Sequence, residues 1–223
     1  MPVRTEDLGK MFEKAICLRF GIAYNGIYKY SLEDAQRVAG LMGKLPELYS
    51  PVCAHTASGG ARYDFTGVSG QLSAKTSKAF HGKVAPQVIG QPQPQKFCDT
   101  LGIPFTSVPE LKMYIQTNIV SVLPVLVEHT FDCHNLYYNK AKGSIRLVRL
   151  VKPIAWGSFT YKWTKDALVW ANSSTLKVVG ADGKAVPIVE FQFHSKSRTN
   201  MAVRWCYDSL LDYFADHFDV VVI

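Results

Sequence analysis

The chain has 223 residues, of which 48% are hydrophobic and 19% are charged. This balance is typical of a globular protein with a sizeable core and excludes disordered and fibrous classes. No run of about 18 apolar residues is present, and the N-terminal segment MPVRTEDLGKMFEK is charged where a secretion signal needs apolar residues. The five cysteines are scattered and form no CxxC pair. We therefore expect a cytoplasmic protein with reduced thiols and no membrane partner.

Positive charge is in surplus, with a formal net charge of +7 and a pI near 9.1. Each phosphate that a Lys or Arg neutralises releases counterions, so such a surplus favours polyanion partners. The GxSxG motif of serine hydrolases and the phosphate-binding loop of NTPases are both absent from the sequence. Nucleic-acid enzymes and nucleic-acid-binding proteins are therefore the classes to weigh first.

Two amphipathic helices are expected in the first 45 residues. The first begins at the capping residue Thr5, and the second begins at Ser31, where Asp34 completes a capping-box-like pair. The second helix should end before Pro46. Apolar residues at helical spacing are expected to face inward: Leu8, Met11, Phe12, Ala15 and Ile16 in the first helix, and Ala35, Val38, Leu41 and Met42 in the second.

A loop and a third helix are expected in the middle of the chain. Residues 84–98, VAPQVIGQPQPQKFC, hold three prolines and four glutamines, which predicts an extended loop. The third helix should follow Ser107, with Pro109 at its first position. Its apolar run continues through Leu123, and Pro124 is expected to kink or end it.

The second half of the chain is rich in β signals, and Asp182-Gly183 predicts a hairpin turn. A final amphipathic helix is expected over 200–215. Helices, a hairpin, more strands and this last helix together indicate an α/β fold, with a mixed central β-sheet flanked by helices in a single domain, 1–223. The expected strands are 144–152, 158–164, 174–180 and 186–194, and the expected inward residues of the last helix are Ala202, Trp205, Leu210 and Leu211.

The most informative segment runs from Asp64 to Lys75, DFTGVSGQLSAK. We expect a hairpin of strands 62–66 and 71–76, in which Asp64 and Lys75 converge at the sheet edge. Gln71, Ser73 and Lys75 share one face of the second strand, whereas Leu72 and Ala74 face the core. A carboxylate that holds Mg²⁺ beside a lysine is the arrangement that phosphodiester hydrolysis needs.

This hairpin resembles the PD-(D/E)xK nucleases, the superfamily of most type II restriction endonucleases. Asp64 and Lys75 match the first and last positions of that motif, whereas Ser73 stands where the family usually has an acid, and Tyr63 stands in place of the proline. The resemblance implies a restriction-endonuclease-like fold and Mg²⁺-dependent cleavage of DNA. The candidates for the second metal-binding carboxylate are Glu13, on the first helix, and Glu190, on a late strand; the resemblance favours Glu13, since a helical Glu near this site recurs in the superfamily.

A second polar segment, 188–205, offers candidate contacts to DNA. Alternation places Val189, Phe191 and Phe193 on one face of a strand and Glu190, Gln192 and His194 on the other. Such segments are similar in style to the DNA-reading parts of some restriction enzymes, where Arg and Gln contact base edges. The expected DNA-binding residues are Gln71, Gln192, His194, Lys196, Arg198, Asn200 and Arg204.

The sequence thus favours a site-specific double-stranded DNA endonuclease of the restriction type. Asp64 and either Glu13 or Glu190 would hold Mg²⁺, and Lys75, with Ser73 beside it, would assist the attacking water. Duplex cutting at palindromic sites would favour a homodimer. Two alternatives remain open at this point: a basic nucleic-acid-binding protein without catalysis, whose binding would survive chelation of metal, and an unrelated basic enzyme.

Overall fold

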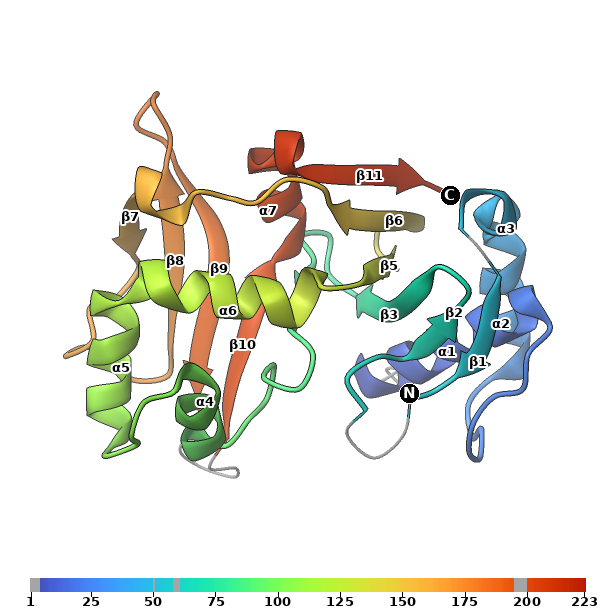
Figure 1. Ribbon diagram of the computed structural model, residues 1–223, viewed down its shortest axis with the longest axis horizontal. Coiled ribbons are helices and arrows are strands. Elements are labelled where there is room, and N and C mark those ends of the chain that lie inside the picture. Colours follow the sequence, from blue (N-terminus) through green and yellow to red (C-terminus); the bar gives the residue numbers. More distant parts are fainter. Residues whose placement is uncertain (1–4, 50, 58–60, 195–199) are drawn as a thin grey trace. The chain divides into compact units, whose positions relative to one another are not determined.

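The computed structural model describes residues 5–49, 51–57, 61–194 and 200–223 (Figure 1). Lys196 and Arg198 lie outside the described residues. The chain divides into two compact units, each assembled from more than one segment. The first unit comprises Met1–Gly82, Cys133–Val151 and Phe218–Ile223, and the second comprises Lys83–Asp132 and Lys152–His217.

The first unit is built on a six-stranded mixed sheet in the order β1-β2-β3-β5-β6-β11 (Figure 1). Strands β3 and β5 are parallel, and every other neighbouring pair is antiparallel. The predicted hairpin and the predicted strand over 144–152 are confirmed, and three further strands (β1, β5, β11) join them. The bounds are β1 Val52–His55, β2 Phe65–Gly67, β3 Gly70–Ser77, β5 His134–Asn139, β6 Ser144–Leu150 and β11 Phe218–Val222.

Helices α1 (Thr5–Phe20), α2 (Leu32–Leu41) and α3 (Leu45–Leu48) belong to the same unit. The cap at Ser31 is confirmed, because its side chain accepts a hydrogen bond from the Asp34 N–H at 3.1 Å. Eight of the nine predicted inward residues are buried, but Leu41 is 48% exposed, since it stands at the last position of α2 and turns off the packed face.

The core of the first unit lies between α1, α2 and the sheet. Phe12 and Ile16 of α1 are fully buried together with Phe65 of β2 and Leu72 of β3, and the partly buried Ala74 packs against them. The prediction that Leu72 and Ala74 face the core is therefore confirmed. This packing sets α1 against β3, so residues of the helix lie beside the hairpin.

The second unit is built on a five-stranded antiparallel sheet in the order β4-β10-β9-β8-β7 (Figure 1). The predicted strands over 158–164, 174–180 and 186–194 are confirmed, and Gly183, with φ 77°, forms the expected turn between the last two. The prediction of α/β architecture with a mixed sheet holds, although the strands form two sheets rather than one. The bounds are β4 Lys83–Val84, β7 Thr160–Trp163, β8 Ser173–Val179, β9 Ala185–Phe193 and β10 Met201–Cys206.

Two expectations for the middle of the chain are wrong in part. The loop predicted over 84–98 ends in a helix that begins at Pro94, because proline suits a first helical turn. The third helix breaks at Asn118, whose backbone and side-chain N–H groups both donate to the Tyr114 carbonyl, and Pro124 stands inside the next helix. The helices are α4 Pro94–Leu101, α5 Val108–Thr117, α6 Ile119–Phe131 and α7 Tyr207–Tyr213, with short 3₁₀ turns at Trp156–Ser158 and Ala215–His217.

The final helix predicted over 200–215 is wrong for its first half. Met201–Cys206 forms strand β10, which pairs with β9, and only Tyr207–Tyr213 is helical. Apolar side chains fill both faces of β10, so the sequence there lacks the alternation that marks a strand. The inward residues Ala202, Trp205, Leu210 and Leu211 are nevertheless all buried.

All five cysteines are free, as predicted, and four of them are buried. Within the described ranges, no helix combines the length and the apolar character needed to span a membrane.

Candidate active site

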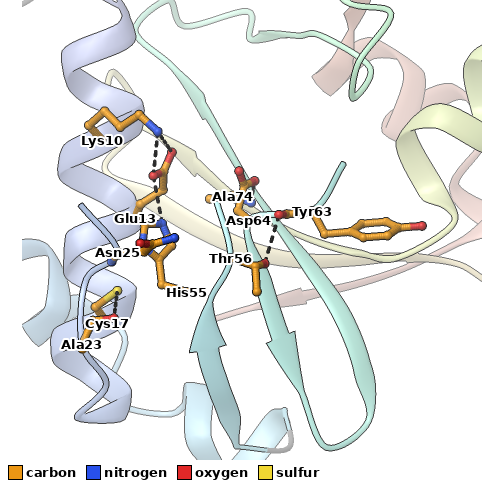
Figure 2. A network of polar contacts seen from close by, with 10 residues as sticks. All are labelled: Lys10, Glu13, Cys17, Ala23, Asn25, His55, Thr56, Tyr63, Asp64 and Ala74. Carbon is orange, nitrogen blue, oxygen red and sulfur yellow. Dashed lines mark hydrogen bonds and ion pairs between the residues drawn. The ribbon is translucent and has the colours of Figure 1, made fainter. Parts of the chain in front are cut away.

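Asp64 is held at both its backbone and its side chain. It directly precedes β2, and its carbonyl accepts hydrogen bonds from the backbone N–H groups of Thr56, at 2.8 Å, and Ala57, at 3.2 Å. Its carboxylate oxygen Oδ2 accepts a hydrogen bond from the Ala74 N–H at 2.8 Å (Figure 2). Because Ala74 lies between Ser73 and Lys75 on β3, this bond fixes the carboxylate against the strand that carries the lysine.

Opposing influences act on the ionisation of Asp64. Burial raises the pKa of its carboxyl group most strongly, and the nearby Glu13 charge raises it further. The Lys75 ammonium, the Ala74 hydrogen bond and the Lys10 ammonium lower that pKa, but the net shift is upward. The charge of Asp64 therefore costs free energy in the folded chain and would be stabilised by an added cation.

Lys75 and Glu13 are both close enough to Asp64 to act on its charge, although they come from different elements, β3 and α1. Ser73, which shares its strand face with Lys75, is fully buried. The predicted hairpin is observed, with Asp64 directly before β2 and Lys75 on β3, but β3 lies inside the six-stranded sheet and not at its edge. The roles of these residues in catalysis stay predictions.

Glu13 is 7% exposed and has two partners of its own (Figure 2). Lys10, one turn earlier on α1, donates to both carboxylate oxygens, at 3.1 and 3.0 Å. His55 of β1 lies 3.1 Å from Oε2 through its Nε2 atom. Sequence reasoning missed His55, because it ends a four-residue strand that carries no periodic signal.

This donor set suits a hard divalent cation. Mg²⁺ is usually held by one or two carboxylates and keeps several waters, and here two carboxylates lie near each other in a partly buried site. Across the part of the chain that the structure describes, no three His, Cys, Asp or Glu side chains gather as metal ligands. Water and a phosphate oxygen would therefore have to complete the coordination of any metal held by Asp64 and Glu13.

Glu190, the other candidate carboxylate, belongs to the second unit. Its oxygens lie 3.0 Å from Lys83 Nζ and 2.7 Å from an Arg204 guanidinium nitrogen. Arg204 also donates to Gln192 Oε1 at 2.6 Å. Strands β4, β9 and β10 thus bring Lys83, Glu190, Gln192 and Arg204 into one polar network, in which the Glu190 charge already has two cationic partners.

The other predicted DNA-binding residues are placed as follows. Gln71, on β3 of the first unit, accepts a hydrogen bond from the Thr66 hydroxyl at 3.0 Å. His194 follows β9, and its backbone N–H donates to the Asn200 carbonyl at 3.1 Å, so the two residues close the base of the segment between β9 and β10. Lys196 and Arg198, between them, lie outside the described residues. No observation tests the DNA contacts of this set.

Along nearly its whole length, the chain is similar to a type II restriction enzyme. That relative is CviAII of Paramecium bursaria Chlorella virus 1, which is 38% identical over 227 residues. The match covers 98% of this chain and 63% of the relative, so the chain spans less than two thirds of that protein's length. No protein-family model matches the chain, and no solved structure matches it significantly.

Proposed function

We propose that the chain is a sequence-specific double-stranded DNA endonuclease of the restriction type. The observation that carries this proposal is the 38% identity to a type II restriction enzyme across 98% of the chain. The basic surplus of +7 fits a polyanionic substrate. The grouping of Asp64, Lys75 and Glu13 supplies the chemistry that such an activity needs.

In this proposal Asp64 and Glu13 hold Mg²⁺. The metal supplies charge stabilisation at the phosphate and an acidified water when it is bound. Asp64 is oriented by the Ala74 N–H, and Glu13 is held by Lys10. Lys75, whose ammonium acts on the Asp64 charge, orients the attacking water or neutralises charge that develops on the phosphate.

We infer from the resemblance of the hairpin that this chain is a PD-(D/E)xK nuclease in which one acid of the motif is replaced. Ser73 stands at the position of the usual acid and carries a hydroxyl group, so the second metal-binding carboxylate must come from another element. Glu13 provides the missing charge from α1, which packs against β3. We favour Glu13 over Glu190 because Glu13 acts on the Asp64 charge, whereas Glu190 is already paired with Lys83 and Arg204.

We further propose that residues 1–223 work as one nuclease domain, in which the first unit carries the cleavage chemistry. DNA contacts would come from Gln71 in that unit and from the β9–β10 segment of the second, whose candidates are Gln192, His194, Lys196, Arg198, Asn200 and Arg204. A homodimer would match the two-fold symmetry of palindromic sites. The five free cysteines support a cytoplasmic location.

The test is cleavage of unmethylated duplex DNA with Mg²⁺. Discrete fragments, lost on chelation and in Asp64→Asn, support the proposal. Salt-sensitive binding of duplex DNA without any cleavage would instead favour a non-catalytic binding protein.

A further inference from the structure

His55 is a buried polar side chain to which neither the sequence pattern nor the proposed reaction assigns a task. Its side chain is 1% exposed. The imidazole packs against two aromatic rings, with centroid distances of 4.5 Å to Tyr24 and 4.9 Å to Phe65. These contacts leave the ring little room to turn. Figure 2 shows the imidazole beside Glu13 and Asn25.

The partners of the two nitrogens determine where the ring proton lies. The backbone N–H of Asn25 lies 2.9 Å from Nδ1, and a backbone N–H is always a donor, so Nδ1 accepts. The proton of the neutral ring must then be on Nε2, which lies 3.1 Å from Glu13 Oε2. His55 therefore donates its Nε2–H to the Glu13 carboxylate, and the loop at Asn25 fixes this tautomer.

The hydrogen bonds from Lys10 alone do not fix the orientation of the Glu13 carboxylate. Lys10 donates to both carboxylate oxygens, but its side chain is 36% exposed and flexible, and an exposed lysine holds a carboxylate loosely. The His55 bond joins two buried side chains from α1 and β1. It acts on Oε2, whereas Oε1 accepts from Lys10 and keeps lone-pair capacity for a metal ion.

We propose that His55 is a positioning residue that orients the Glu13 carboxylate toward Asp64 through its Nε2–H hydrogen bond. This inference rests on the proposed function, because it concerns the same divalent-cation site. A histidine in this place performs the task that outer hydrogen-bond partners perform for metal-binding carboxylates elsewhere, where their loss typically lowers metal affinity or activity by about 10- to 100-fold.

The test compares His55→Phe with His55→Gln. Phenylalanine keeps the packing between Tyr24 and Phe65 but removes the donor, whereas the glutamine amide keeps an N–H that can reach Glu13. His134→Phe is the matched control, because it makes the same change on β5 of the same sheet, where His134 packs on Tyr49 at 5.1 Å. Mn²⁺ binding, followed by the loss of the free-ion paramagnetic resonance signal, is measured beside the Mg²⁺ concentration for half-maximal cleavage.

The inference predicts that His55→Phe weakens Mn²⁺ binding by about tenfold or more and raises the half-maximal Mg²⁺ concentration to match. His55→Gln should recover part of both losses, and His134→Phe should leave both unchanged. Wild-type Mn²⁺ affinity in His55→Phe would overturn the inference. So would equal losses in the Phe and Gln variants, which would indicate a packing role.

Failure of the proposed function would look different. A wild-type protein that binds Mn²⁺, loses affinity in His55→Phe and cuts no duplex would contradict the nuclease and support the positioning role. A wild-type protein that cuts DNA and shows no effect of His55→Phe would overturn the positioning role alone. If His55→Phe does not fold, the Mn²⁺ affinity of His55→Gln, set against that of Glu13→Gln, decides the question: an affinity as low as that of Glu13→Gln overturns the inference, and an intermediate one supports it.

Discussion

The Asp64 carboxylate accepts the backbone N–H of Ala74 at 2.8 Å. This bond occupies the place where β2 would otherwise continue its pairing with β3, since the ladder ends at Phe65 and Leu72. The Ala74 N–H thus binds the Asp64 side chain, where it would otherwise bind the backbone of a neighbouring strand. The consequence is a fixed acidic group beside Lys75, with a charge that the folded chain itself does not stabilise fully.

Asp64→Asn should separate stability from activity. The raised pKa means that the folded state binds this proton more tightly than the unfolded chain. The free energy of unfolding therefore falls as pH rises from the ordinary aspartate pKa to the raised one, and the loss is complete above it. Asparagine can still accept from Ala74 but carries no charge. We expect a melting temperature at neutral pH equal to or above that of the wild type, with cleavage reduced at least about a hundredfold.

Asp182→Asn is the control, because Asp182 is an exposed residue in the β8–β9 turn. It should leave cleavage unchanged. Mg²⁺ should raise the melting temperature of the wild type and of this control but not that of Asp64→Asn. A marked loss of stability in Asp64→Asn at neutral pH would contradict the account of its charge.

Glu13→Gln and Glu190→Gln should have opposite effects. Glu13 acts on the Asp64 charge, so its replacement should abolish cleavage while the helix stays folded. Glu190 pairs with Lys83 and Arg204, whose side chains are 42% and 36% exposed, so its replacement should cost about 1 kcal/mol of stability and leave cleavage intact. The measurement is single-turnover cleavage by each variant, at a temperature well below the melting temperatures of Glu13→Gln and Glu190→Gln. Cleavage lost only in folded Glu190→Gln would reverse our assignment of the second carboxylate.

Lys75→Ala should change the pH dependence as well as the rate. The Lys75 ammonium lowers the pKa of Asp64, so its removal lets that pKa rise further. If metal binding needs the ionised carboxylate, the acidic limb of the residual activity moves to higher pH, and the maximal rate falls about a hundredfold. Rate profiles of the wild type and Lys75→Ala test this. Identical acidic limbs would show that Lys75 does not act on Asp64 during cleavage.

Lys196 and Arg198 should contribute to DNA affinity through phosphate contacts. Removing either should lower the salt dependence of duplex binding by about one unit of slope, since each neutralised phosphate contributes about 0.9. Binding measured over a range of salt concentrations with Ca²⁺ in place of Mg²⁺ tests this. Lys184→Ala is the control, because that lysine is 84% exposed in a turn and pairs with Asp182. An unchanged slope in Lys196→Ala and Arg198→Ala would remove this segment from the DNA interface.

The sequence was most informative where side chains show a period. The α1 and α2 faces and the β8–β9 hairpin were predictable because one side of each element is apolar. Strands β5 and β10 were missed because buried residues occupy both of their faces, which removes the alternation. For the same reason β10 was mistaken for the start of a helix.

The residues of the candidate site also differ in how far the sequence could predict them. Asp64 and Lys75 are close in sequence, so a hairpin turn was enough to predict their approach. Glu13 could only be proposed as one of two carboxylates, because its approach depends on how α1 packs against the sheet. His55 could not be found at all, since the bond to Glu13 spans 42 positions and begins in a short strand without a pattern.

The most direct test of the central claim is digestion of unmethylated phage DNA with Mg²⁺ by the wild type, Asp64→Asn and Glu13→Gln. We expect discrete, reproducible fragments from the wild type, no fragments from either variant, and duplex binding retained by all three. Undigested DNA with the folded wild type, or the same fragments with Asp64→Asn, would contradict it.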